Sequence, residues 1–311
     1  MQHELPLVSV IVLTYNSSLY VLETLDSIKK QTYRNIELII TDDYSQDDTV
    51  DICKKWLNAN RNSFSNALLV ESDQNTGISP NCNRALKQAS GKWIKLIAGD
   101  DALEETVISD YISFSANYPQ AAAIFCRMCA YNEIFNDQSI VQLISNASKR
   151  FNAATITPDA QFEILLRQNC INAPTVIVKK EVVDEVGGFD EDFLFLEDWP
   201  MWLALTKAGY PIRFLDKAGI KYRLHNTSVQ DLRNKKRFMA VVDVDVDNLF
   251  RKKYIQYLSR PERVAKGFLI WRNTVLRRVF NNKSNRLIRV LSFILGAVPS
   301  LILRHYRKRF V

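Results

Sequence analysis

Cysteine is scarce in this 311-residue chain, and its distribution argues against a disulfide-stabilised fold and a zinc fold. The five cysteines form an odd set, and several lie inside apolar segments. That pattern is typical of reduced core thiols in a cytosol. Cys126 and Cys129 form one C-x-x-C pair without a suitably spaced second pair, so we interpret them as structural rather than as zinc ligands.

Glycine is also sparse, and the glycine-rich turn of dinucleotide-binding folds is absent. Residues 14–18 read Thr-Tyr-Asn-Ser-Ser after the first apolar run, where a dinucleotide oxidoreductase would have G-x-G-x-x-G. The nine glycines lie mostly at turns, and there is no repeat of fixed period. Residues 1–6 are mostly polar and precede an expected strand, so we expect no N-terminal signal peptide.

Charge is unevenly divided along the chain. Hydrophobic residues make up 47% of the sequence, enough for a sizeable core, and the net charge is +7. Residues 226–311 hold 20 Lys and Arg against 5 Asp and Glu, so this part carries +15 and the remainder carries −8. An acidic body with a basic tail predicts an anionic partner for the tail, either a nucleic acid or an anionic membrane leaflet.

The tail contains a nearly continuous apolar run at residues 287–303, interrupted by Arg289 and Pro299 and flanked by basic residues. A run of 17 residues is short for crossing a bilayer but fits an interfacial or re-entrant helix with basic anchors. We therefore expect residues 284–311 to associate with the anionic inner face of the plasma membrane. The alternative is a helix packed on the protein's own core or on a second subunit. Nucleic acid is not expected as a partner, because the apolar run is hard to keep solvated in a nucleic-acid-binding arm.

Hydrophobic periodicity predicts alternating strands and helices, which favour a parallel sheet covered by helices. The expected strands are 8–13, 37–41, 67–71, 93–97, 121–131, 175–178, 212–215 and 220–223. The expected helices are 21–31, 49–57, 80–89, 104–117, 158–168 and 199–208, with a variable excursion at 132–157 and a helical pattern from residue 231.

Two acidic pairs, Asp42-Asp43 and Asp100-Asp101, each follow an apolar strand-like run. We expect them at the carboxyl ends of neighbouring parallel strands, the edge where α/β sheets bind ligands. Crowded carboxylates are most easily explained by a bound cation or by hydrogen-bond donors, and a divalent metal carrying a diphosphate supplies both needs. Asp47 and Asp48 precede the helix expected at residue 49, and we interpret them as caps.

An ordered series of short motifs resembles the family 2 glycosyltransferases. The matching pieces are residues 8–16, 27–32, 39–48, 75–77, Asn83, 90–94, 99–101, 187–190, 197–198 and 222–225. The resemblance implies an α/β fold of the GT-A nucleotide-diphospho-sugar transferase type at residues 1–230. Such a domain has a Rossmann-like, mainly parallel sheet with helices on both faces. Residues 231–311 lie outside the resemblance as a basic helical extension.

The resemblance also implies a nucleotide site formed by Thr14, Tyr15, Asn16, Asp43 and Asn83. Thr14 and Tyr15 would line the base, and Asp43 would accept from the pyrimidine imide N–H. A flat aromatic ring and a carboxylate suit the face and the edge of such a base. Read without the family, Tyr15 is a core aromatic and Thr14 an ordinary strand end.

In the family's second acidic motif, Asp-x-Asp, the first carboxylate is replaced here by Ala98. The resemblance therefore leaves Asp100 as the principal ligand of Mg²⁺ or Mn²⁺, with Asp101 and His225 as further ligands. A hard cation that keeps several waters accepts so few protein oxygens. A dispensable metal and a structural histidine are the alternatives.

For an inverting transfer, a carboxylate must take the proton of the acceptor hydroxyl, and the resemblance assigns this to Asp198. Glu197, Asp190 and Trp199 would lie on the acceptor side. Without the family, the Glu197-Asp198 pair is a helix N-cap, and both roles are compatible.

These features predict a cytoplasmic enzyme, peripheral or monotopic at the membrane. It would move a sugar from a nucleotide-diphosphate donor, a uridine diphosphate sugar by preference, to a hydroxyl of a lipid-linked glycan in surface polysaccharide synthesis. One alternative is a thymidine-diphosphate-rhamnose-using transferase, because thymine presents the same imide edge. The other is a noncatalytic membrane-associated nucleotide-sugar binding protein, supported by the incomplete Asp-x-Asp.

Overall fold

The computed structural model describes residues 5–144, 150–225, 238–239 and 241–310. The chain divides into two compact units, residues 1–161 with 170–224, and residues 162–169 with 225–311. The boundary predicted between residues 230 and 231 lies outside the described residues. The second unit also takes in the short segment 162–169 from the middle of the chain.

In the first unit, nine strands of the described chain form one sheet in the order β3-β2-β1-β4-β8-β6-β9-β5, with β7 beside β6. They are β1 (Val8–Thr14), β2 (Ile36–Asp42), β3 (Asn66–Glu71), β4 (Trp93–Ala98), β5 (Ala102–Leu103), β6 (Ala123–Asn132), β7 (Ile140–Ile144), β8 (Val176–Lys179) and β9 (Ile212–Leu224). Strands β3, β2, β1 and β4 pair in parallel, as do β6 and β9. Antiparallel pairing of β8 with β4 and β6 joins these two parts, so the sheet is mixed.

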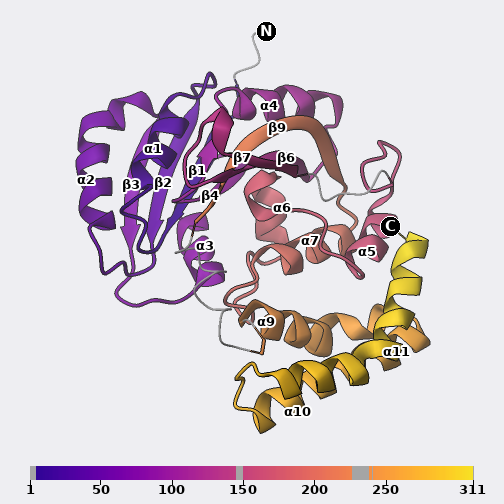
Figure 1. Ribbon diagram of the computed structural model, residues 1–311. Helices are drawn as coiled ribbons and strands as arrows, with labels where there is room; N and C mark the ends of the chain where they lie inside the picture. Colours follow the sequence, from indigo (N-terminus) through magenta and orange to yellow (C-terminus); the bar gives the residue numbers. More distant parts are fainter. Residues whose placement is uncertain (1–4, 145–149, 226–237, 240, 311) are drawn as a thin grey trace. The chain divides into compact units, whose positions relative to one another are not determined.

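Helices lie on both faces of the sheet in the first unit (Figure 1). They are α1 (Val21–Lys29), α2 (Thr49–Asn60), α3 (Ile78–Leu86), α4 (Val107–Asn117), α6 (Lys180–Glu185) and α7 (Asp198–Lys207). Val8, Val10 and Val12 of β1 share a core cluster with residues of α1, α2 and α4. The intervening Ile11 is equally buried but lies outside that cluster, on the face where α3 contacts β1 and β2. Burial on both faces explains the continuous apolar runs of these strands.

The two strands expected at 212–215 and 220–223 form one continuous strand, β9. Asp216 and Lys217, which lie between the two expected strands, fall on an irregular stretch of the β6–β9 ladder. There the Asp216 carboxylate forms an ion pair of 2.5 Å with Arg127. Gly219 is required at this position, because a Cβ would lie 2.4 Å from Val107 Cγ2.

The second unit is helical, with α9 (Val241–Leu249), α10 (Arg260–Val279) and α11 (Arg286–Phe310). The helical pattern expected from residue 231 is confirmed from Val241 on, whereas 231–237 lie outside the described residues. Helix α5 (Pro158–Leu165) spans the junction in sequence between the two units. Within the second unit, Arg167 Nε donates to the buried carboxylate of Glu262 at 2.7 Å.

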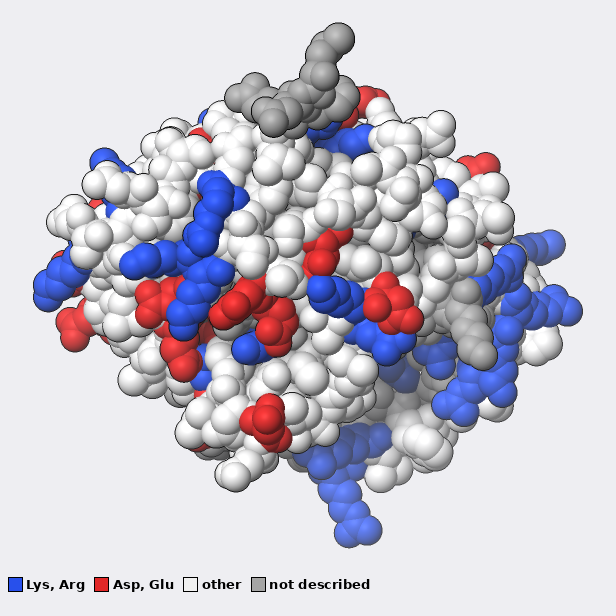
Figure 2. All heavy atoms as spheres, turned by 90° about the horizontal axis from the view of Figure 1, so that it is seen from above, with Lys and Arg blue, Asp and Glu red and all other residues white. Residues whose placement is uncertain are grey.

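Helix α11 is, among the described residues, the one helix long and apolar enough to cross a membrane by length and composition. Only 11% of its apolar window is buried, and within the second unit it packs on α10. Arg272 of α10 donates to the carbonyl of Ser292 in α11 at 2.7 Å and passes Gly296. On the surface in Figure 2, Lys and Arg side chains gather at the right of the view, whereas acidic and basic side chains mix on the left.

All five cysteines are free thiols, and four of them are buried. Cys126 lies in the core, where the Tyr111 hydroxyl donates to its Sγ at 2.9 Å. The interpretation of reduced core thiols without a disulfide framework is therefore confirmed.

Candidate functional site

The two acidic pairs lie at the same edge of the sheet, where β1, β2 and β4 end. Asp42 is the last residue of β2, and Asp100 follows β4 by two residues. Strand β1 pairs in parallel with both, so all three carboxyl ends share one edge. The predicted edge is confirmed, with one difference: β1 separates the strands that carry the pairs.

The carboxylate of Asp42 is buried and receives donors from the end of β1 and from the loop after β2. It accepts from the Thr14 hydroxyl at 2.8 Å, from Ser45 N–H at 2.8 Å and from the Ser45 hydroxyl at 2.6 Å. Thr14 itself is only 2% exposed, and its hydroxyl is used to hold Asp42. Three donors leave about one acceptor position of this carboxylate open.

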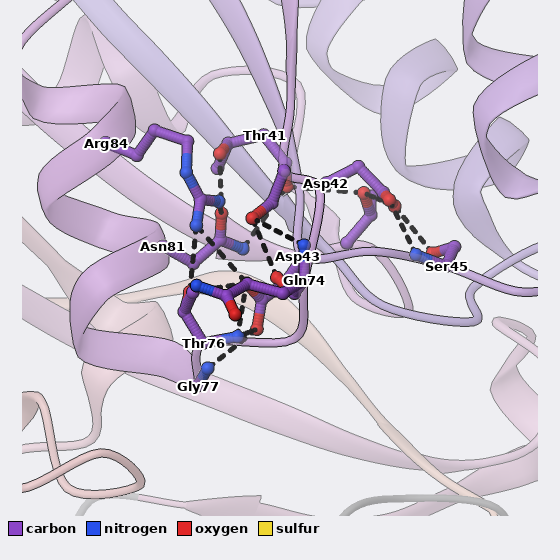
Figure 3. A network of polar contacts seen from close by, with 11 residues as sticks. Thr41, Asp42, Asp43, Ser45, Gln74, Thr76, Gly77, Asn81 and Arg84 are labelled. Carbon is purple, nitrogen blue, oxygen red and sulfur yellow. Dashed lines mark hydrogen bonds and ion pairs between the residues drawn. The ribbon is translucent and has the colours of Figure 1, made fainter.

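The carboxylate of Asp43 anchors the turn that precedes α3 (Figure 3). It accepts from Thr76 N–H at 3.0 Å, from the Thr76 hydroxyl at 2.6 Å and from Gly77 N–H at 2.8 Å. Arg84 of α3 adds an ion pair at 3.4 Å. A carboxylate has roughly four acceptor positions, so these four donors leave the Asp43 carboxylate with little capacity for a further hydrogen bond.

Two exposed tyrosines lie on the loops that follow β1 and β2. Tyr15 is 40% exposed and Tyr44 is 46% exposed. Asn16 joins the two loops, because its N–H donates to Ser45 Oγ at 2.8 Å and its Oδ1 accepts from Gln46 N–H at 2.8 Å. The reading of Tyr15 as a core aromatic is therefore wrong.

Sequence reasoning did not select Tyr44. Its φ of +70° is rare for a non-glycine residue and marks a constrained loop, a property that no local pattern reveals. Its only signal in the sequence is that it directly follows the first acidic pair.

Asp101 is 2% exposed and accepts from Arg223 N–H at 2.9 Å. Burial and the adjacent charge of Asp100 raise the pKa of Asp101 well above its ordinary value. The buried Arg223 guanidinium donates to the Asp100 carbonyl at 2.7 Å and pairs with Glu23. Arg223 is thus neither a surface ion pair nor free for a diphosphate.

Lys95 of β4 is fully buried, and it was also missed from the sequence, where it reads as one polar residue in an apolar strand. Its ammonium donates to the Leu96 carbonyl at 2.8 Å and to the Pro174 carbonyl. Burial lowers the pKa of Lys95 to about 8, whereas the charge of Asp101 raises it. Lys95 is thus a buried positive charge near the second acidic pair, and no local pattern of residues indicates it.

A divalent cation fits the chemistry of the second acidic pair, because it would relieve the repulsion between Asp100 and Asp101. Asp100 is half-buried and Asp101 is almost completely buried. Within the described ranges, no three His, Cys, Asp or Glu residues are grouped as a metal-binding cluster. His225 is the first residue of the second unit. Asp100 and Asp101 are the residues that would hold such a cation, and a hard cation that keeps its waters accepts so few protein oxygens.

Helix α7 begins at Asp198, and Glu197 is its N-cap residue without a capping bond from its side chain. Asp198 Oδ1 accepts from Trp199 N–H at 2.6 Å, and Trp199 is half-buried. Burial, and then the charge of Asp198, raise the pKa of Glu197 to about 7. Asp190 Oδ1 accepts from Asp192 N–H at 3.2 Å, within its own turn.

Asn83 contacts the turn before Asp198, whereas Thr14, Tyr15 and Asn16 lie on the strand edge. Its side-chain amide binds Phe189 and Glu191. Of the predicted nucleotide residues, the structure thus brings Thr14, Tyr15, Asn16 and Asp43 together at the edge of β1 and β2. The Asn83 amide instead binds the turn at Phe189 and Glu191.

The raised pKa of Glu197 predicts a stability that depends on pH. The folded protein holds the Glu197 proton up to about pH 7, whereas the unfolded chain releases it near the ordinary value of 4.5. Folding stability contributed by this group is therefore fully present below about pH 4.5 and decreases as pH rises to about 7. Urea unfolding midpoints at pH 5 and pH 7.5 should differ less in Glu197→Gln than in the wild type. An unchanged difference would contradict the raised pKa.

Comparison with known proteins finds similarity to glycosyltransferases. The family model described as "Glycosyl transferase family 2" matches residues 9–183. The Escherichia coli protein UDP-Glc:alpha-D-GlcNAc-diphosphoundecaprenol beta-1,3-glucosyltransferase WfaP is 29% identical over 72% of this chain and 79% of its own length. The putative teichuronic acid biosynthesis glycosyltransferase TuaG of Bacillus subtilis is 25% identical over 72% of this chain and 81% of its own.

Solved structures share the fold. S. aureus TarS, residues 1–349, has a TM-score of 0.57 and 21% identity, covering 97% of this chain and 89% of that one. The Pyrobaculum calidifontis mannosyltransferase PcManGT, solved with GDP-Man and Mn²⁺, has a TM-score of 0.54 and 17% identity, covering 99% of this chain and 74% of that one. The predicted GT-A fold is confirmed by these similarities.

Proposed function

Because the chain belongs to glycosyl transferase family 2 and is a glycosyltransferase, we propose that it moves a sugar, with inversion, from a uridine diphosphate donor to a hydroxyl of a lipid-linked glycan in surface polysaccharide synthesis. One observation carries the proposal: a buried carboxylate with spare acceptor capacity, two exposed tyrosines and a second acidic pair share one sheet edge. The name of the relative WfaP, which includes UDP-Glc and a diphosphoundecaprenol acceptor, supports the proposed classes of donor and acceptor.

The nucleotide would bind at the ends of β1 and β2. Tyr15 and Tyr44 offer flat apolar faces for a pyrimidine, and Asn16 holds their two loops together. The imide N–H of uracil or thymine needs a carboxylate acceptor. Asp43 is the acceptor that the family resemblance implies, and Asp42 is the one with an open acceptor position. Thr14 would act by orienting Asp42.

The diphosphate would lie toward Asp100 and Asp101, which would hold Mg²⁺ or Mn²⁺. When bound, the cation would neutralise the charge that develops on the departing diphosphate.

Asp198 would take the proton of the acceptor hydroxyl during its attack on the anomeric carbon. Burial, and then the charge of Asp198, raise the pKa of Glu197 to about 7, so Glu197 would hold its proton beside the proposed base below that pH. Asp190 and Trp199 would bind the acceptor.

Helix α11 would hold the enzyme at the cytoplasmic face of the membrane, near a lipid-linked acceptor. Its exposed side chains include Phe293, Ile294, Val298 and Leu301, and basic residues follow at its C-terminal end. Apolar insertion with cationic anchors is the arrangement of interfacial helices.

Calorimetric titration tests the donor site directly. We expect uridine diphosphate to bind the full-length protein more tightly with Mn²⁺ present, because Asp100 and Asp101 would hold the cation and its charge would attract the diphosphate. Thymidine diphosphate is the matched ligand for the rhamnose alternative, and guanosine diphosphate is the control for a purine base. If neither uridine diphosphate nor thymidine diphosphate binds, the proposed donor class is overturned. Binding without turnover would favour the noncatalytic alternative.

A further inference from the structure

Helix α3 is hydrogen-bonded along its length to the turn that precedes the proposed base. Near its start, Ile78 N–H donates to the Leu194 carbonyl at 2.7 Å, and the Ser79 hydroxyl donates to the Phe193 carbonyl at 2.7 Å. Ser79 is completely buried. These bonds hold one side of the 188–194 turn on the helix.

Asn83 holds the other side of this turn through both ends of its amide. Its Nδ2 donates to the Phe189 carbonyl at 2.8 Å and to Glu191 Oε1 at 2.8 Å, and its Oδ1 accepts from Phe189 N–H at 2.8 Å. The two bonds to Phe189 reproduce the pairing of a peptide group. Such a pair fixes both position and orientation of the backbone, which a single contact does not.

The same helix is fixed at its N-terminus by the nucleotide edge. Asp43 receives the N–H groups of Thr76 and Gly77, directly before α3 begins. Gly77 has a φ of +96°, and a Cβ there would lie 3.0 Å from Leu194. One rigid element therefore contacts both Asp43 and the 188–194 turn.

The chain reaches the Glu197–Asp198 pair within a few residues of this turn. Glu197 also lies close enough to α3 for its charge to act on Cys82, one residue before Asn83 in that helix. We propose that Asn83 is a positioning residue, which holds the 188–194 turn on α3 and thereby sets the place of the Asp198 carboxylate against the donor site. This role rests on the proposed function, in which Asp198 is the base.

Two adjacent glycines provide a matched pair of variants for this contact. Gly187 has a φ of +91° and Gly188 a φ of +79°, so alanine is strained at both. A Cβ at Gly188 would lie 2.8 Å from Asn83 Oδ1, whereas a Cβ at Gly187 has nothing within 4 Å. Both variants therefore strain the backbone. Only Gly188→Ala also displaces the Asn83 side chain.

The experiment compares Asn83→Ala and Gly188→Ala with Gly187→Ala and the wild type in the full-length protein. We expect kcat with UDP-glucose or UDP-N-acetylglucosamine, whichever the wild type uses, to fall about 10- to 100-fold in the first two, because small misplacement of a reacting group costs this much. The Kd for uridine diphosphate and the donor KM should stay within about twofold. Gly187→Ala should keep kcat close to the wild type.

A second readout does not depend on activity. Trp199 directly follows Asp198, so its ¹⁹F resonance after 5-fluorotryptophan labelling, assigned with Trp199→Phe, reports the position of the base. We expect this resonance to shift or broaden in Asn83→Ala and Gly188→Ala but not in Gly187→Ala, while the Trp56 resonance stays unchanged. Asn83→Asp keeps the acceptor for Phe189 N–H but turns a carboxylate toward the Phe189 carbonyl and the Glu191 carboxylate, so it should show a change at least as large as Asn83→Ala.

The outcomes separate this proposal from the proposed function. If the wild type fails to bind either pyrimidine diphosphate, the donor assignment fails, and the ¹⁹F comparison still decides whether Asn83 positions the Asp198 segment. If Asn83→Ala weakens uridine diphosphate binding at least tenfold with kcat unchanged, Asn83 is a nucleotide ligand and the positioning role is overturned. An unmoved Trp199 resonance with a wild-type kcat also overturns it.

Discussion

Asp198→Asn is expected to lower turnover by about 10²- to 10⁴-fold, the usual contribution of a positioned general base. The amide keeps the size of the carboxylate, and its oxygen can still accept from Trp199 N–H as Asp198 does at 2.6 Å. It cannot take the proton of the acceptor hydroxyl. Steady-state kinetics should therefore show a loss in kcat, while calorimetry shows a Kd for uridine diphosphate within about twofold of the wild type.

Glu197→Gln is the matched control for this variant. Glutamine resembles the protonated Glu197 that its raised pKa predicts near neutral pH, so turnover at pH 7 should change far less than in Asp198→Asn. If Asp198→Asn retains wild-type turnover, Asp198 is not the base. If instead Glu197→Gln abolishes turnover, the base assignment moves to Glu197.

Replacing Phe293, Ile294, Val298 and Leu301 of α11 with serine is expected to release the protein from membranes. These side chains are 77%, 62%, 66% and 62% exposed, so the substitutions remove little internal packing. Insertion of each large apolar side chain into the bilayer contributes about 1.5–3 kcal/mol. Loss of all four should reduce partitioning onto phosphatidylglycerol–phosphatidylethanolamine vesicles by at least about 100-fold.

The control replaces four exposed apolar residues of the first unit, Ile134, Ile140, Val141 and Leu143, which are 44–59% exposed. This variant should bind vesicles as the wild type does, and flotation measures both. Equal binding by the α11 variant and the wild type would contradict an apolar anchor. If the wild type no longer binds vesicles in high salt, the basic residues rather than the apolar side chains attach the protein.

The first half of the fold was predictable because its signals are local. Strands β1, β2 and β4 are buried on both faces, and their continuous apolar runs are visible in the sequence. Parallel strands joined by helices bring their carboxyl ends to one edge. This was enough to place Asp42-Asp43 and Asp100-Asp101 at a common edge without knowledge of any side-chain contact.

The second half was less predictable because its pairing is set over long distances. Two-residue β5 has no periodicity to detect, and it exists only because Ala102 and Leu103 pair with β9. The polar residues within β9 look like a turn until the ion pair between Asp216 and Arg127 of β6 is seen. Tertiary pairing overrode the local pattern at both places.

The sequence shows which residue types form the site, but it does not show which contacts each residue makes. Order and spacing of the motifs place carboxylates and aromatics in a family 2 glycosyltransferase. Only the packed structure reveals that Asp43 is occupied by Thr76 and Gly77, and that the amide of Asn83 binds Phe189, 106 residues away. A hydrogen bond between distant segments depends on how the sheet and its helices bring backbones together, and no local pattern of side chains records that arrangement.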